Sequence, residues 1–295
     1  FPYTTLFRSL LKFIADLEDI LARPERVIEI IKTELNDVRT KFGDARRTEL
    51  LVGEVLSLED EDLIEEEEVV ITLTNNGYIK RMANSEFRAQ RRGGRGVQGM
   101  GVHDDDFVKN LVSCSTHDTL LFFTNTGKVY RAKGYEIPEY GRTAKGIPVI
   151  NLLGIDSAEK IQAIISVEGK AEAGKYLFFT TLKGTVKRTA VTAFSNIRSN
   201  GLIAISLKED DELVNVVTTN GNQKMIIGTH AGYSVTFDEN TVRDMGRTAS
   251  GVRGIRLREN DYVVGAAILD ENKEVLVITE NGYGKRDRKS TRLNS

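Results

Sequence analysis

The stretch VVITLTNNGYIKR, residues 69–81, decides the fold, because the chain repeats its pattern. A run of apolar and β-branched residues leads into Asn76-Gly77, and a second run ends in the basic pair Lys80-Arg81. Asn-Gly between two such runs is a strong signal for a β-hairpin. Four more copies follow, which read TLLFFTNTGKVYR at 119–131, KYLFFTTLKGTVKR at 175–188, KMIIGTHAGYSVTF at 224–237 and EVLVITENGYGKR at 274–286.

The five hairpin phrases recur with a period of about 50 residues, a spacing that signals a propeller or a related array. Their turn glycines are Gly77, Gly127, Gly184, Gly232 and Gly282. We therefore predict a mainly β, propeller-like domain over residues 69–287. The loop that should follow the fifth hairpin would fall beyond Ser295, so we expect the fifth blade to be incomplete.

A second phrase, rich in arginine and glycine, keeps step with the hairpins. It reads RRGGRG at 91–96, RTAKG at 142–146, RSNG at 198–201 and RTASG at 247–251. Glycine lets the main chain approach a ligand closely, and arginine offers planar, permanently charged donors to phosphate oxygens. Because equivalent positions in a closed array point to one rim or side, these loops predict a phosphate-binding surface.

The total charge is nearly balanced, with 41 basic and 43 acidic residues, so the distribution of charge decides what it indicates. The repeat loops are basic, whereas much of the negative charge lies in LEDEDLIEEEE at 58–68. This acidic block is either a solvated linker or a segment that competes with DNA for the basic side of the domain.

Cysteine and histidine usage argues against a disulfide framework and against a metal site. The single cysteine, Cys114, suits a reducing cytosol, so we expect a cytoplasmic protein. His103, His117 and His230 are scattered and have no partner at ligand spacing. The apolar runs are too short to cross a membrane, and we expect no membrane partner.

The first part of the chain differs in kind, because its apolar residues follow a helical period from Leu10 to Phe42. Pro24 divides this run, since proline fits only the first turn of a helix. We predict two helices, over 10–22 and 24–42, within a helical segment at 1–43. A connector that contains the acidic block follows at 44–68.

Together these phrases resemble a known family. The QRRGGRG loop at 90–96 is similar to the signature box of the C-terminal domain of the DNA gyrase A subunit. The phrases GYIKR, SEFRAQRRGGRGVQGM and MGRTASGVRGIRL are similar to the repeats of that family. ELNDVRTKFGDARRTEL resembles the end of the long coiled coil of the breakage-reunion domain and the connector after it. The resemblance covers roughly residues 10–286 and implies a β-pinwheel, in which neighbouring four-stranded blades exchange strands.

The resemblance also implies a function, which is to wrap double-stranded DNA around a basic rim in a positive sense. The wrap lets the ATP-dependent type II topoisomerase introduce negative supercoils. The partners implied are duplex DNA, a second A subunit, and the B subunit of gyrase. ATP and Mg²⁺ belong to the B subunit, so no cofactor is expected here. The region of the catalytic tyrosine is missing, and the fragment should bind DNA without catalysing a reaction alone.

The site residues follow from this resemblance and from the basic character of the repeats. The expected DNA contacts in the box are Gln90, Arg91, Arg92, Gly93, Gly94, Arg95 and Gly96. Those in the later loops are Arg142, Lys145, Arg198, Arg247 and Arg253, and those on hairpin strands are Lys80, Arg81, Arg131, Lys187 and Arg188. Adjacent strand residues face opposite sides, so only one member of each Lys-Arg pair can point at DNA.

The chain departs from the family pattern in two places. The fourth unit has Val235 and Thr236 where other units carry basic or aromatic residues, so its blade should contribute less to wrapping. Residues 1–9 and 288–295 match neither repeat nor connector, and we expect them to be non-native joins. Two alternatives stay open: the related C-terminal domain of topoisomerase IV, and a propeller-like scaffold for protein interactions.

Overall fold

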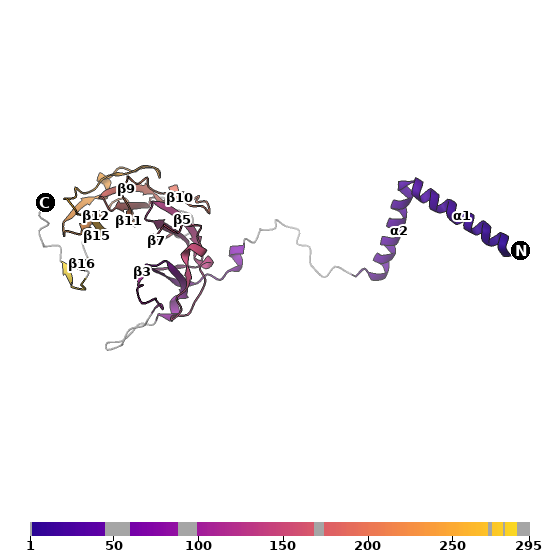
Figure 1. The fold of residues 1–295 in the computed structure, drawn as a ribbon, viewed down its shortest axis with the longest axis horizontal. Coiled ribbons are helices and arrows are strands. Elements are labelled where there is room, and N and C mark those ends of the chain that lie inside the picture. Colours follow the sequence, from indigo (N-terminus) through magenta and orange to yellow (C-terminus); the bar gives the residue numbers. More distant parts are fainter. Residues whose placement is uncertain are drawn as a thin grey trace. The chain divides into compact units, whose positions relative to one another are not determined.

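The computed structural model describes residues 2–44, 60–87, 99–167, 174–270, 273–279 and 281–287 (Figure 1). The chain divides into two compact units, 1–57 and 58–295. The first unit is helical, and the second is built of β-sheets.

The helical unit consists of α1 (Pro2–Ala22) and α2 (Pro24–Phe42). Pro24 lies in the first turn of α2, as predicted, but α1 begins at Pro2 and not at residue 10. Leu6 and Phe7 extend its apolar pattern, which explains the earlier start. Across the bend between the helices, the Arg26 guanidinium forms ion pairs with Asp16 at 3.0 Å and Asp19 at 2.7 Å.

Each of the five repeat phrases forms a β-hairpin in the second unit, as the sequence predicted. Gly77, in the first turn, has a φ of +85°, a conformation that glycine adopts without strain. The hairpins are β1 (Glu68–Thr74) with β2 (Tyr78–Ala83), β4 (Thr119–Thr124) with β5 (Lys128–Lys133), β8 (Tyr176–Thr181) with β9 (Thr185–Ala190), β12 (Lys224–Thr229) with β13 (Ser234–Asp238), and β16 (Val275–Ile278) with β17 (Gly284–Asp287).

The sheets exchange strands. Longer strands follow the first four hairpins and pair with the first hairpin strand of their own unit; they are β3 (Val108–Ser115), β7 (Ile161–Val167), β11 (Leu213–Thr219) and β15 (Val263–Leu269). Two-residue strands instead join the sheet of the preceding unit; they are β6 (Ile147–Pro148), β10 (Leu202–Ile203) and β14 (Val252–Arg253).

The resulting strand orders are β3-β1-β2-β6, β10-β5-β4-β7, β11-β8-β9-β14 and β13-β12-β15, with a two-stranded β16-β17 sheet. This exchange confirms the pinwheel arrangement that the family resemblance implied. Among the described residues the fourth sheet has three strands and the fifth has two, as expected of an array that is incomplete in its fifth blade.

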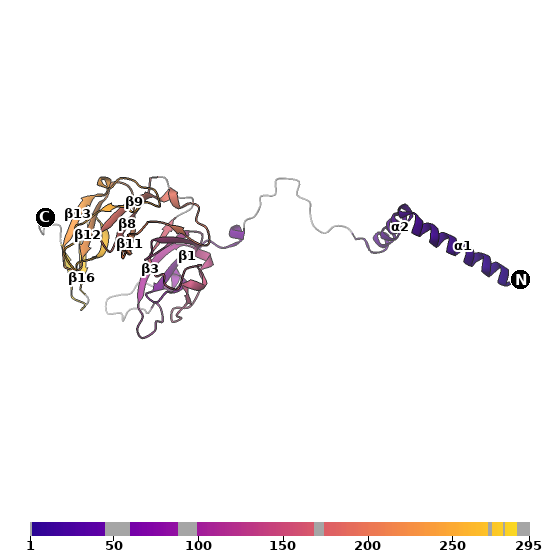
Figure 2. The same ribbon diagram turned by 45° about the horizontal axis from the view of Figure 1, so that its top comes forward.

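The exchange strands lie on the outer edges of the sheets. At the opposite edges, β7 contacts both β3 and β11, and β11 contacts β15, so these four strands form the inner side of the array. Figure 2 shows consecutive sheets standing next to one another in chain order. Because β6, β10 and β14 occupy the far edges of the first, second and third sheets, they form an outer rim.

Three apolar clusters fill the spaces between neighbouring sheets. In β4, Leu120 and Phe122 belong to the first cluster, whereas Leu121 and Phe123 belong to the second. The run TLLFFT is continuously apolar because both faces of its sheet are covered by other sheets. Phe178 and Val186 join Met225 and Ile227 in the third cluster.

Short 3-10 helices connect these strands. They are η1 (Asp60–Leu63), η2 (Asn84–Glu86), η3 (Gly134–Glu136), η4 (Val149–Asn151), η5 (Val191–Phe194) and η6 (Glu239–Thr241). After β5, β9 and β13, the helices η3, η5 and η6 redirect the chain toward the preceding sheet.

Candidate nucleic-acid interface

Three exchange segments form the candidate interface, and we define them as residues 138–149, 195–205 and 243–255. The first runs along β2 of the preceding sheet. The Arg81 amide donates to the Pro138 carbonyl at 3.1 Å, and the Val149 amide donates to the Gly77 carbonyl at 2.8 Å. The segment therefore follows the whole outer edge of β2, from its end back to the hairpin turn.

The third exchange segment repeats this course along β9. The Met245 amide donates to the Arg188 carbonyl at 2.9 Å, and the Gly254 amide donates to the Gly184 carbonyl at 2.9 Å. In the second exchange segment, the Ala204 amide donates to Gly127 in the same way at 2.8 Å. Basic loops that recur in the sequence are thus brought to equivalent places on three consecutive sheets.

In the three basic loops that the structure describes, the closing glycine is required by close packing against the preceding sheet. A Cβ atom on Gly146 would lie 2.3 Å from the Ile79 carbonyl oxygen, and one on Gly251 would lie 2.5 Å from that of Val186. Gly201 presses against the Tyr130 ring in the same manner. This contact explains why the glycines recur, and it fixes the basic residues beside them on the outer edge.

Most of the predicted loop cations reach solvent on this edge. Arg142 has a side chain that is 46% exposed and lies 3.7 Å from Glu86, and Arg247 is half-buried. The remaining cations of the set are exposed; they are Lys145, Arg198, Arg253 and, on β5, Arg131. The structure therefore gathers cations of the later loops on one rim.

Two predicted contacts, Lys80 and Lys187, lie elsewhere. Both side chains are 0% exposed, so they are removed from the set of residues that can touch DNA. The Lys80 ammonium donates to the carbonyls of Gly141 and Arg142 at 2.9 and 2.8 Å, and that of Lys187 donates to Ala204 at 2.6 Å and to Arg247. Burial lowers the pKa of both lysines, to about 8 for Lys187.

The neighbouring residues Arg81 and Arg188 also make contacts within the protein. The Arg188 guanidinium is nearly buried, lies 4.7 Å from the centre of the Tyr176 ring and donates to Asn240 at 3.1 Å. The Arg81 guanidinium, whose side chain is 16% exposed, lies 3.5 Å from Glu139. The Arg81 side chain therefore contacts the first exchange segment, whereas that of Arg188 contacts β8 and η6.

The QRRGGRG box, Gln90 to Gly96, lies outside the described residues. Its role stays a prediction from the sequence.

The structure shows further exposed cations that were not among the predicted contacts. Arg256 and Arg258 continue the line of Arg247 and Arg253, and the Arg258 guanidinium lies 3.9 Å from the centre of the Tyr233 ring. The spacing of arginines in RTASGVRGIRLREN was the signal for them. Within the described parts of the rim, arginines are therefore most closely spaced between Arg247 and Arg258, where the third sheet meets the fourth.

A repeated carboxylate, which the sequence reasoning missed, holds the hairpin turns. Asp106 accepts hydrogen bonds from the amides of Asn76 and Phe107 at 3.0 and 2.9 Å. Burial alone would raise the pKa of Asp106, but these bonds and one from Thr74 lower it overall. Asp211 and Asp261 bind the turns of their sheets in the same way.

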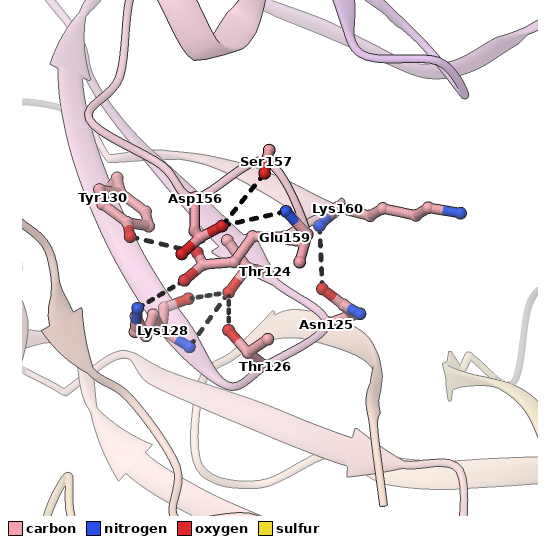
Figure 3. Close-up of polar contacts among 10 residues, drawn as sticks. Thr124, Asn125, Thr126, Lys128, Tyr130, Asp156, Ser157, Glu159 and Lys160 are labelled. Atoms are coloured by element: carbon pink, nitrogen blue, oxygen red, sulfur yellow. Dashed lines mark hydrogen bonds and ion pairs between the residues drawn. The ribbon is translucent and has the colours of Figure 1, made fainter.

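In the second repeat, Glu159 occupies the position equivalent to Asp106, and it has a different set of partners (Figure 3). Its carboxylate accepts a hydrogen bond from Lys128 at 2.5 Å and one from the Tyr130 hydroxyl at 3.1 Å. The turn itself is held by Asn125, whose side-chain oxygen accepts from the Lys160 amide at 2.9 Å. The longer Glu side chain thus reaches the strand instead of the turn.

The acidic segment at 60–67 is held against the β3–β4 turn. The Glu67 amide donates to the Thr116 hydroxyl at 3.0 Å, and the Ser115 hydroxyl donates to Glu66 at 3.1 Å. Glu61 forms an ion pair with Lys133 at 2.7 Å. Part of the acidic block therefore packs on the β unit near the start of the first exchange segment.

The described part of the chain also bears on three other features, which are metal sites, a reactive thiol and membrane-spanning helices. No group of three or more His, Cys, Asp or Glu side chains there could hold a metal ion. Burial raises the pKa of the Cys114 thiol to about 12, so it stays protonated and is a poor nucleophile. No helix among the same residues is long and apolar enough to cross a membrane.

Comparisons with known proteins agree with this geometry. The chain is 65% identical over 244 residues to the A subunit of DNA gyrase from Streptococcus pyogenes serotype M3, and the match covers 83% of this chain and 30% of that protein. The chain therefore spans less than a third of the length of the curated relatives it matches.

Two solved structures share the fold at 30% identity. The C-terminal domain of DNA topoisomerase IV aligns with a TM-score of 0.64 over 77% of this chain and 69% of that one. The DNA gyrase A C-terminal domain aligns with a TM-score of 0.63 over 76% and 72%. The family model described as "DNA gyrase C-terminal domain, beta-propeller" matches residues 68–115, 118–168, 175–220, 223–270 and 273–286. The chain belongs to this DNA gyrase C-terminal domain family.

Proposed function

We propose that the β unit is a DNA-wrapping domain that binds duplex DNA around its outer rim. The observation that carries this proposal is the placement of exposed cations on the outer edges of three consecutive sheets. Arg142, Arg198 and Arg253 stand on the first, second and third exchange segments in turn. A curved duplex that follows the rim would meet them one after another.

The rim suits recognition that does not depend on sequence. Arginine and lysine side chains on an outer surface contact phosphates, which fix the path of DNA without reading bases. Each phosphate contact releases counterions, and this gain offsets the cost of bending a site of 20–30 base pairs, which is about 1–6 kcal/mol. Holding the cations on a rigid edge of sheet avoids a further entropic cost on binding.

In the whole enzyme, we propose that the wrap has a positive sense and presents a neighbouring duplex for strand passage. The ATP-dependent type II topoisomerase would then introduce negative supercoils. This role requires a second A subunit, together with the B subunit, which holds ATP and Mg²⁺. It places the protein in the cytoplasm with the chromosome. In that enzyme, the part described by this chain would supply the surface that binds DNA.

Gyrase is favoured over topoisomerase IV by sequence. The two solved domains align about equally well in structure, but the curated relative at 65% identity is a gyrase A subunit. The QRRGGRG box is also intact in this chain. A protein-interaction scaffold remains the alternative of a different class, and it predicts no affinity for DNA.

Duplex binding at several salt concentrations tests the proposal. Phosphate contacts predict that log K falls linearly with log salt, with a slope of about −0.9 for each contact. If the protein is folded but has no affinity for a duplex at low salt, the wrapping function is wrong and the protein-interaction scaffold is the better interpretation.

A box variant tests the proposed role of Gln90–Gly96. We expect Arg91, Arg92 and Arg95, all changed to Ala, to abolish the topological effect of wrapping while the fold is retained. The control is Lys109→Met, because Lys109 binds the Ile161 carbonyl at 3.1 Å on the inner strands. Wrapping that persists in the triple variant would contradict the role of the box.

A further inference from the structure

Lys80 and Lys187 share one unusual contact with the rim. Each is a fully buried lysine whose ammonium group binds the main-chain carbonyl of an arginine on an exchange segment. Lys80 binds the carbonyl of Arg142 at 2.8 Å, and Lys187 binds that of Arg247. In both cases the bonded arginine is one of the proposed DNA contacts.

The sequence of the repeats shows that this lysine and its loop occur together. The loops that Lys80 and Lys187 hold both read Gly-Arg-Thr, at 141–143 and 246–248. The second exchange segment, which reads IRSNG, lacks this triplet, and the β5 residue that faces it is Tyr130. Among the first three hairpins, the two that carry the lysine are therefore the two whose partner segment carries the triplet, and Lys285 stands at the same position of the fifth hairpin.

Each lysine donates a second hydrogen bond to another main-chain carbonyl. Lys80 also binds the Gly141 carbonyl at 2.9 Å, which pins the residue before Arg142. Lys187 also binds the Ala204 carbonyl at 2.6 Å, which belongs to the second exchange segment. Lys187 thus links two neighbouring exchange segments through one ammonium group.

Burying these ammonium groups is unfavourable for folding, so the sheet alone does not explain them. No ion pair with a carboxylate is formed by either lysine among the described residues, and Lys187 lies near the charge of Arg247. An unbranched apolar residue of similar length would fill the same space without desolvating a charge. Val235 occupies the equivalent position of the fourth unit, which shows that the strand does not need a lysine.

We propose that Lys80 and Lys187 are positioning residues for DNA wrapping, each fixing through a main-chain carbonyl the rim arginine that contacts phosphate. This inference rests on the proposed function. An arginine on a loop held at its own carbonyl keeps its guanidinium at one place on the rim. Without that bond, the loop would still carry its charge but would present it over a wider range of positions.

A double-variant cycle in the full chain tests this coupling. The variants are Lys187→Met, Arg247→Ala and their combination, and the readout is the linking-number shift of relaxed circular plasmid closed by topoisomerase I. If Lys187 acts through Arg247, Lys187→Met should reduce the shift about as much as Arg247→Ala, and the double variant should be no worse. Independent losses that multiply in the double variant would overturn the proposal.

Lys109→Met is the matched control, because Lys109 also ties two segments together through backbone and side-chain oxygens. It binds the Ile161 carbonyl at 3.1 Å and the Gln162 side chain at 2.6 Å, on inner strands without a rim arginine. We expect this variant to lower Tm yet keep the full linking-number shift at a temperature where it is folded. Equal losses of shift in Lys109→Met and Lys187→Met would show a general stability effect and contradict positioning.

The pair Lys80 and Arg142 provides a second, independent cycle if Lys187→Met does not fold. If both lysine variants are unfolded, Lys80 and Lys187 are needed for the stability of the fold, and this result would overturn their role as positioning residues. The linking-number shift of the unsubstituted chain distinguishes failure of the proposed DNA-wrapping function from failure of the positioning role. If the unsubstituted chain gives no shift, the proposed function itself fails; if it gives a shift that Lys80→Met and Lys187→Met retain, only the positioning role fails.

Discussion

The Tyr130 hydroxyl donates to the Glu159 carboxylate at 3.1 Å, and this pair holds the outer edge of the second sheet where its neighbours use a buried lysine. The Tyr130 ring packs on Gly201, which closes the basic loop of the second exchange segment. Glu159 also binds Lys128 at 2.5 Å, so one carboxylate serves two residues of β5. The exchange segments are thus attached in two ways: by a buried lysine in the first and third sheets, and by the Tyr130 ring in the second.

Replacement of Glu159 with Ala should destabilise the β unit. The side chain of Glu159 is 3% exposed, and its loss leaves the Tyr130 hydroxyl without its acceptor. An unsatisfied buried polar group costs about 1–3 kcal/mol. Urea unfolding monitored by circular dichroism measures the change.

The control for this prediction is Glu209→Ala, since Glu209 is exposed. A surface substitution of this kind should stay within about 0.5 kcal/mol. If the two variants unfold at the same urea concentration, the role assigned to Glu159 is wrong.

Alanine at Gly146 should be strongly unfavourable. Gly146 has a φ of +75°, and a Cβ atom there would meet the Ile79 carbonyl oxygen at 2.3 Å. We expect a loss of more than about 1 kcal/mol of unfolding free energy from the strained backbone alone. The matched control is Gly246→Ala, because a Cβ atom on Gly246 meets nothing within 4 Å. Equal stabilities of the two variants would contradict the close packing.

The unfolding free energy should rise with pH between about 8 and 10.5 because of Lys187. Burial lowers the pKa of Lys187 from 10.5 to about 8, so in this window the unfolded chain binds the proton and the folded chain does not. Stability increases with pH wherever the unfolded state binds more protons, by at most about 1.4 kcal/mol per pH unit for one group. Below pH 8 both states are protonated and this contribution is constant.

The difference between the unchanged chain and Lys187→Met isolates this effect from other titrating groups. Urea unfolding at a series of pH values should show the extra upward slope only in the unchanged chain. Identical slopes in the two proteins would show that the ammonium group is not desolvated.

Loss of one rim arginine should weaken DNA binding and its salt dependence together. Arg253→Ala removes one exposed cation of the third exchange segment, so the slope of log K against log salt should become shallower by about 0.9. Lys109→Met, on the inner strands, should leave the slope unchanged. Fluorescence anisotropy with a labelled duplex measures both, and an unchanged slope in Arg253→Ala would remove that residue from the interface.

The hairpins and their period could be predicted from sequence because turn residues and alternating runs are local signals. The apolar run of β4 and Asn76-Gly77 indicated strands and turns without tertiary information. The exchange strands could not be predicted from the residues alone. Ile147–Pro148 is two residues long, and its pairing with Tyr78 and Ile79 depends on a contact between distant segments. The family resemblance supplied that feature.

The roles of the basic strand residues were harder to predict. Lysine is almost always exposed, so Lys80 and Lys187 looked like surface contacts. Lys80 is buried against the carbonyls of Gly141 and Arg142 in the next repeat, and Lys187 against those of Ala204 in its own repeat and Arg247 in the next. The signal that could have revealed it was the Gly-Arg-Thr triplet, which follows in the unit after each lysine. The exposed loop cations were easier to predict, because the glycine beside them fixed their place.

The most direct test of DNA wrapping is a topology assay on the full chain. Relaxed circular plasmid is incubated with the protein at low salt, closed with topoisomerase I, and stripped of protein before electrophoresis. Wrapping around the rim predicts positive supercoils that accumulate with protein concentration and vanish at high salt. Duplex binding without any change in linking number would contradict DNA wrapping around the rim.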